Sequence, residues 1–177
     1  MPGVPVIGMP DPESWFGWKP RQQQFVDAFF QLVVFTLQEQ LYALRLAAVD
    51  RIARVAEITA LPSAPDIVQG VVNIQGSIVP VISLRRRFGM PDREVELSDH
   101  LIFARTSRRA VALLVASVVG VIDCSQAQVA ASEAILADAA YVEGVLKLDD
   151  GLVLIHDLDT FLSPIEERRL AQALAAR

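Results

Sequence analysis

The sequence predicts a mainly β protein that builds one structural unit twice. Three observations support this prediction: a repeated stretch, its many β-branched residues, and the turn residues between its apolar runs. The stretch from Val68 to Leu84 (VQGVVNIQGSIVPVISL) returns 74 positions later as Val142 to Leu158 (VEGVLKLDDGLVLIHDL). The two copies are identical at Val68/Val142, Gly70/Gly144, Val71/Val145, Val79/Val153 and Leu84/Leu158. With 177 residues, of which 53% are apolar, the chain can bury the core of one domain or of two small lobes.

The first unit is expected to begin with a hairpin. Leu32 to Leu37 has the composition of a strand, Gln38 to Gln40 form a polar turn, and Leu41 to Leu46 return as a second strand. Ala47 to Val55 has helical spacing but is short. We therefore expect a helical turn that leads into a strand.

The repeated stretch supplies a second hairpin to each unit. We place its two turns at Gly76-Ser77 and at Asp149 to Gly151. Each second strand then reaches a helix N-cap, Ser83 in one copy and Asp157 in the other. Pro80 lies inside a second strand, which predicts an edge or bulge position because proline cannot donate a backbone hydrogen bond.

The second unit repeats the first hairpin as well. Leu101 to Arg105 and Ala110 to Val115 are expected strands, and Ala112 to Val118 resemble Ala43 to Val49 at a shift of 69. The repeated stretch further along has a shift of 74, which is five more than 69. The second unit therefore has a net insertion of five residues near Ser125 to Ala140, where a short helix from Ser132 is expected.

The chain is expected to end in a helix. Ser163 at the N-cap, Pro164 at N1 and Glu166 at N3 make a capping box. We expect an apolar stripe of this helix, which includes Leu170, to pack on the rest of the protein.

We therefore divide the chain into an N-terminal arm and one domain. Residues 1–24 lack an apolar period and are expected to be mobile. The domain at 25–177 then holds a first unit at about 32–89, a charged connector at 90–100, a second unit at about 101–162 and the helix at 163–177. The aromatic cluster from Trp15 to Trp18 can fold back onto the domain or dock a partner, and the sequence leaves both open.

Composition excludes several classes of protein. A net charge of −5 argues against a general nucleic-acid binder. The single Cys124 cannot form an internal disulfide, and its apolar neighbours predict a small buried side chain in a reducing compartment. The N-terminus is a poor signal peptide, and the longest nearly apolar run, Phe25 to Leu37, is too short to span a bilayer. We expect a cytoplasmic protein.

The sequence offers little catalytic chemistry. Its His/Asp pairs, His156-Asp157 and Asp99-His100, are adjacent residues that point to opposite faces of a strand. The acidic turn near His156 is a weak candidate for a metal site, because its residues belong to a turn and a helix cap. We therefore expect no catalytic residue, metal or cofactor. The basic run Arg85 to Arg87 can be a solvated face or a patch for an acidic partner.

Several of these segments, in this order and spacing, resemble the CheW family of bacterial chemosensory coupling proteins. They are Leu32–Leu37, Tyr42–Val49, Ala64-Pro65, Gly70–Gly76, Ile78–Leu84 and Gly144–Leu158. The resemblance implies two five-stranded, SH3-like β-barrels packed side by side. It also implies a non-enzymatic adaptor that joins the cytoplasmic tips of chemoreceptors, in membrane-associated arrays, to the regulatory domain of the CheA histidine kinase.

The resemblance further implies a partner interface. The positions that match coupling-sensitive family positions are Val49, Arg51, Gly70, Gln75 and Gly76. The family commonly has glutamate where Arg51 stands, arginine where Gln75 stands and aspartate where Ala116 stands. These departures put the identity of the partners in doubt and suggest a dedicated pathway.

Two questions stay open from the residues alone. A turn explains Gly76 better than a partner contact does, whereas Gly70 fits either explanation. The alternative function is a small-barrel hydrolase or ligand-binding enzyme centred on His156 and the acidic turn.

Overall fold

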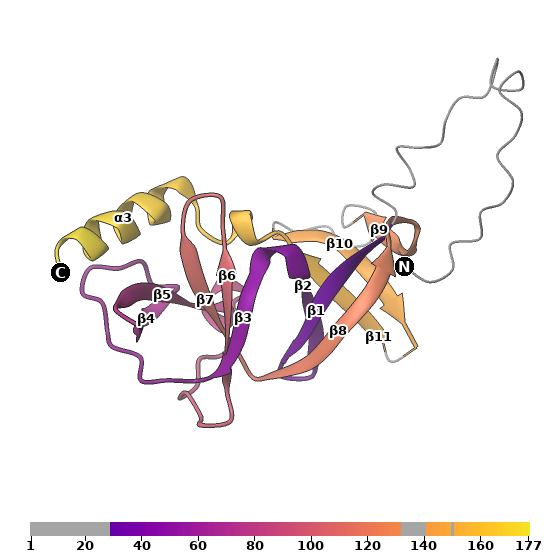
Figure 1. Ribbon diagram of the computed structural model, residues 1–177, viewed down its shortest axis with the longest axis horizontal. Helices are drawn as coiled ribbons and strands as arrows, with labels where there is room; N and C mark the ends of the chain where they lie inside the picture. The colour runs from indigo at the N-terminus through magenta and orange to yellow at the C-terminus, as the bar shows by residue number, and fades with distance from the viewer. Residues whose placement is uncertain (1–28, 132–140, 150) are drawn as a thin grey trace, which may run out of the picture.

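A computed structural model describes residues 29–131, 141–149 and 151–177, which form two β-sheets and a C-terminal helix (Figure 1). The six-stranded sheet has the order β8-β1-β2-β11-β10-β9, and the five-stranded sheet has the order β3-β6-β7-β5-β4. The strands are β1 (Phe29–Leu37), β2 (Gln40–Arg45), β3 (Val49–Arg54), β4 (Val68–Ile74), β5 (Ser77–Ser83), β6 (His100–Arg105), β7 (Ala110–Val115), β8 (Ser117–Ser125), β9 (Val129–Ala131), β10 (Val142–Leu148) and β11 (Gly151–His156). The helices are η2 (Leu46–Ala48), α2 (Leu84–Arg87), η3 (Gln126–Gln128), η5 (Leu158–Thr160) and α3 (Pro164–Ala175).

The two repeated units exchange strands. The hairpin β1/β2 of the first unit pairs with β8 and β11 of the second unit, and the hairpin β6/β7 of the second pairs with β3 and β5 of the first. When each strand is replaced by its counterpart, the order β8-β1-β2-β11-β10 becomes β3-β6-β7-β5-β4. Each sheet therefore takes two strands from one unit and the others from the second.

Irregularities in the sheets also repeat. β3 is bulged between Val49 and Arg51, and β8 carries its bulge at the matching position, at Val119. β4 and β10 shift register between Val68 and Gly70 and between Val142 and Gly144, which are matching pairs. The sequence repeat thus encodes local backbone geometry as well as strand order.

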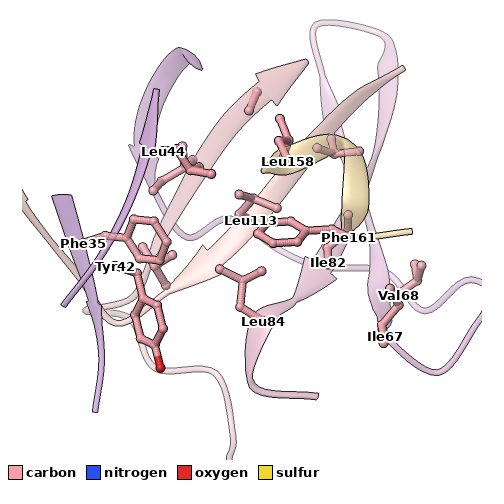
Figure 2. Packing of buried hydrophobic residues seen from close by; sticks show 14 of the residues in the cluster. Phe35, Tyr42, Leu44, Ile67, Val68, Ile82, Leu84, Leu113, Leu158 and Phe161 are labelled. Atoms are coloured by element: carbon pink, nitrogen blue, oxygen red, sulfur yellow. The ribbon is translucent and has the colours of Figure 1, made fainter. Parts of the chain in front are cut away.

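Among the described residues, buried apolar side chains form three cores. One cluster lies within the six-stranded sheet and includes Leu32, Val34 and Ile155, and a second lies within the five-stranded sheet and includes Val81 and Phe103. The largest cluster lies between the sheets, and Figure 2 shows Phe35, Leu113 and Phe161 within it. Strands such as β1 contribute alternate residues to two cores, which explains why they are apolar at nearly every position.

The local helix signals act as expected. The hydroxyl of Ser83 accepts a hydrogen bond from the backbone N–H of Arg86, and the Asp157 carboxylate accepts one from Asp159. At α3, Ser163 and Glu166 form the predicted capping box, with Pro164 in the first turn. Leu170 of α3 packs into the core between the sheets, as predicted.

The structure refines several expectations. The six-stranded sheet has one strand more than predicted, because β9 adds to β10. The hairpin between β4 and β5 turns at Gln75-Gly76, one residue earlier than expected. Pro80 pairs with Val71 on β4 at a point where β5 has not yet met β7, so the edge-position prediction is confirmed.

Some predictions fall outside the described residues. These are the N-terminal arm with its aromatic cluster, the short helix from Ser132, and Asp150 of the acidic turn. Cys124 is described and is buried as predicted, and its burial raises the pKa of the thiol. In the ranges that the structure covers, no helix is long and apolar enough to cross a membrane.

Candidate partner interface

All five predicted interface residues lie on the five-stranded sheet. Val49 and Arg51 belong to β3 at one edge, and Gly70, Gln75 and Gly76 belong to β4 and its turn at the other. The chain after β3 joins these edges, because Thr59 forms a bridge with Val71 of β4. The structure therefore places the five residues on one barrel, in two groups.

The β3 group presents a positive charge at a sheet edge. The bulge at Asp50 lets Arg51 stand opposite Phe103, and its guanidinium carbon lies 4.9 Å from the centre of that ring. Asp50 itself binds Arg105 at 3.0 Å. Within the described part of the chain Arg51 forms no salt bridge, so its exposed charge is held by a cation–π contact and stays available.

The β4–β5 group is a tight turn. Gln75 and Gly76 have φ angles of +52° and +87°, and both signs are those of a two-residue hairpin turn. The Asn73 side-chain oxygen accepts a hydrogen bond of 2.9 Å from the N–H of Gly76. A Cβ atom at Gly76 would meet no described atom within 4 Å, so the backbone conformation, and not a close neighbour, explains this glycine.

Gly70 is buried, and it has a packing reason to be glycine. A Cβ atom there would lie 2.3 Å from the carbonyl oxygen of Thr59, which crosses β4 at that point. Gly144, its counterpart, would place a Cβ atom 2.4 Å from Val129 of β9. Because the same close crossing occurs in both barrels, packing explains Gly70, and its contact with a partner remains a prediction.

Sequence reasoning missed two exposed apolar residues beside these positions. Ile52 of β3 is 38% exposed and Ile78 of β5 is 39% exposed. Ile52 belongs to the helical spacing of Ala47 to Val55, which conceals its place on a strand face. The signal that would have found it is the period of two in a strand, which places Ile52 on the same face as the charged Arg54.

The basic run Arg85 to Arg87 mainly makes internal contacts. Arg87 donates hydrogen bonds to Glu166 at 2.6 Å and to the hydroxyl of Tyr141 at 3.0 Å. Burial alone would lower the pKa of Arg87, but these partners outweigh burial and raise it. Arg86 binds Asp92 and the Asp66 carbonyl. These contacts show that the run is not a fully solvated face, and a patch for an acidic partner remains a prediction.

His156 is a buried part of an aromatic cluster. It is 4% exposed, and its ring centre lies 4.6 Å from that of Phe88, 5.3 Å from Tyr42 and 5.6 Å from Phe161. Its Nδ1 lies 3.0 Å from the carbonyl oxygen of Tyr141, which requires the N–H to be on Nδ1. Burial lowers the pKa of His156 from 6.5 to about 4, so the ring is neutral near pH 7.

Ala116 lies in the connection between β7 and β8. Its N–H donates a hydrogen bond of 3.1 Å to the carbonyl oxygen of Thr36 on β1. The third departure from the family pattern therefore lies at a junction between the two sheets, away from β3 and the β4–β5 turn in strand order.

Comparisons with known proteins agree with this architecture. A family model described as the CheW-like domain matches residues 31–166. The chemotaxis protein CheW of Treponema pallidum is 27% identical over 151 residues, which cover 82% of this chain and 89% of that protein. The chemotaxis protein CheW of Rhizobium meliloti is 29% identical over 143 residues, with coverages of 80% and 92%. The crystal structure of the scaffolding protein TtCheW from Thermoanaerobacter tengcongensis is similar, with a TM-score of 0.71 at 30% identity and coverages of 77% and 94%.

Proposed function

Because the chain belongs to the CheW-like domain family, we propose that it is a non-enzymatic adaptor that couples chemoreceptors to a CheA-type histidine kinase. The observation that carries this proposal is the family match over residues 31–166, which spans both sheets. We further propose that its direct partners are the regulatory domain of the kinase and the cytoplasmic tip of a receptor, and that it works at membrane-associated receptor arrays.

The architecture suits an adaptor. Because the two repeated units exchange strands, the two sheets hold their exposed surfaces in a fixed relative position. A partner on one barrel can thus be placed relative to a partner on the other. Arg51 and Ile52 on β3, and Gln75 at the hairpin turn, provide exposed charged, apolar and polar groups for the first of these surfaces.

The enzyme alternative is not supported. It rested on His156 and the acidic turn, and His156 packs against Phe88, Tyr42 and Phe161 in the core. The family match supplies a function that needs no catalytic group.

We also propose that the adaptor serves a dedicated pathway. Relative to the common family pattern, Arg51 changes the local charge by about two units and Gln75 by about one, with opposite signs. A like-charge contact in a desolvated interface costs several kcal/mol, which is enough to exclude a wrong partner. The cognate partner should therefore place an acidic or neutral group opposite Arg51.

Isothermal titration tests this proposal. The partner sets are the cognate kinase regulatory domain with its receptor fragment and a standard pair from a common-pattern system. The double change Arg51→Glu with Gln75→Arg should weaken cognate binding and strengthen binding to the standard pair. Arg54→Glu is the matched control, since Arg54 is exposed on the same strand but is not among the five positions.

The dedicated pathway and the adaptor function can each be contradicted by a different result. Equal affinities for both partner sets, before and after the double change, would remove the dedicated pathway but keep the adaptor. Absence of binding to any CheA-type regulatory domain and any receptor fragment would remove the adaptor itself.

A further inference from the structure

A groove of about 800 Å³ lies between the C-terminal half of α3 and the loop that joins β3 to β4. Figure 1 shows this loop reaching the C-terminal end of the helix. Its apolar lining comes from Leu61 and Pro62 of the loop and from Ala173 and Ala176 of the helix end. The groove shares no residue with the five interface positions on β3, β4 and the β4–β5 turn.

The rim of the groove is positively charged. Arg169 and Arg177 line it, and none of the other described lining residues has a charged side chain. Across the described ranges, neither arginine forms a salt bridge, whereas Arg87 and Arg109 at the other end of α3 are paired with Glu166 and Glu167. In a chain with a net charge of −5, the groove therefore combines an apolar floor with two guanidinium groups that no described carboxylate neutralises by a salt bridge.

The exposed face of α3 extends this surface. Ile165, Arg169, Gln172 and Ala176 follow a spacing of four, three and four residues, so they lie on one side of the helix. Ile165 is 64% exposed, although the opposite side of α3 packs into the core through Leu170. This exposed face therefore carries, in order, the apolar Ile165, the cationic Arg169, the polar Gln172 and the small Ala176.

We propose that this groove docks an amphipathic helix of a protein partner, with its apolar stripe on the groove floor and acidic residues against Arg169 and Arg177. A groove beside a helix accepts another helix through residues at i, i+3 or i+4, and i+7. Arg169 lies within α3 and Arg177 lies beyond its last residue, Ala175, so the two guanidinium groups stand at different points along the groove. Acidic residues on more than one turn of the partner helix can therefore pair with both.

The test uses the full chain and a synthetic helix of about 18 residues, long enough to be helical on its own. The peptide carries leucines at the i, i+4 and i+7 positions of one face and glutamates two turns apart on the flank. Fluorescence anisotropy of the labelled peptide measures its affinity. The same peptide with lysine in place of each glutamate is the peptide control.

Matched variants locate the binding. Arg169→Glu with Arg177→Glu should weaken binding about tenfold or more, because two ion pairs become like-charge contacts. Arg168→Glu makes the same change of charge on an exposed residue of α3 that does not line the groove, so it should leave binding nearly unchanged. Binding of all variants to a CheA-type regulatory domain should stay the same, which separates this proposal from the proposed function.

Several results would overturn the proposal. They are no binding of the acidic peptide, equal binding of the lysine peptide, or equal losses in Arg168→Glu and in the double variant. Binding to phosphatidylglycerol vesicles that is lost in the double variant would assign the groove to a lipid surface instead.

Discussion

Close packing requires a glycine at position 70, whereas a positive φ favours a glycine at position 76. Gly70→Ala puts a Cβ atom 2.3 Å from the Thr59 carbonyl oxygen, so the loop crossing β4 must move. We expect a loss of about 1–3 kcal/mol in the free energy of unfolding. Gly76→Ala meets no described atom within 4 Å and should cost only about 1 kcal/mol, through its positive φ. Urea unfolding of both variants measures this difference.

The test is which of the two variants, Gly70→Ala or Gly76→Ala, loses more free energy of unfolding. If Gly76→Ala is the more destabilising change, the crossing of Thr59 over β4 is not the reason for glycine at position 70. If Gly70→Ala folds stably but no longer binds the kinase regulatory domain, the partner surface explains this glycine instead.

His156 should make stability depend on pH. Its pKa is about 4 in the folded protein and is expected near 6.5 in the unfolded chain, so the unfolded state binds the extra proton. The contribution of the neutral ring is fully present above about pH 6.5 and is lost as the pH falls towards about 4. The shift corresponds to roughly 3.5 kcal/mol at most, since one pKa unit is about 1.4 kcal/mol.

The measurement compares wild type with His156→Gln. Urea unfolding at about pH 7 and at about pH 4.5 gives the pH dependence of each protein. The wild type should lose more stability on acidification than the variant, because the carboxylates that also titrate are common to both. Equal losses would mean that His156 is not buried as a neutral ring.

At the scale of the helix α3, the first turn is held by arginines from two other elements. Arg87 of α2 binds Glu166, and Arg109 at the end of the β6–β7 loop binds Glu167 at 2.5 Å. Glu167 and Arg87 are largely buried, so both pairs are partly shielded from water. The position of α3 on the sheets therefore depends on these two contacts as well as on Leu170.

We expect Arg87→Ala to destabilise the protein by about 2–3 kcal/mol, because it leaves Glu166 and the Tyr141 hydroxyl without their shared partner. Arg86→Ala is the matched control from the same basic run. Its pair with Asp92 is more exposed, so the loss should be about 1 kcal/mol or less. Thermal unfolding followed by circular dichroism gives both values, and equal losses would contradict the role assigned to Arg87.

The helix caps show what local sequence can predict. Ser83, Asp157 and Ser163 were identified as N-caps from their own neighbours, because a cap is a contact between residues two or three positions apart. The degree of exposure of Ile52 was not predictable in this way, because it depends on which residues distant in the sequence pack on its face of β3. The role of Arg87 likewise depends on Glu166, which is 79 positions away.

At the scale of the whole molecule, neither unit should fold alone. β1 and β2 obtain their outer neighbours from the second unit, and β6 and β7 obtain theirs from the first. We expect residues 1–97 and residues 98–177, expressed separately, to lack cooperative unfolding transitions. The cut falls next to Leu97, an 88% exposed residue of the connector. When the halves are mixed, native circular dichroism and cooperativity should return.

A stable, cooperatively unfolding single half would contradict this prediction. The sequence repeat predicted that a unit is built twice, and the resemblance implied two barrels. Which strands pair across the units did not follow from either, because the repeat is the same whether each unit closes on itself or on its neighbour. Only long-range pairs such as Val49 with Ala104 and Phe30 with Cys124 decide it.

The exchange of strands has a consequence for ancestry. In a single unit with this plan, the hairpin that corresponds to β1/β2 needs neighbouring strands, and the strand that corresponds to β3 needs a hairpin to pair with. In this fold the second unit supplies these partners. Two copies of such a unit would pair the edges of the hairpin and of the strand by exchanging them in a symmetric dimer. Gene fusion would then have turned two subunits into one chain, with the connector at 90–100 as the join. Each barrel could then acquire residues that the other lacks. Arg51 on β3 and Gly120 on β8, which stand at matching positions of the two units, show how far that divergence has gone.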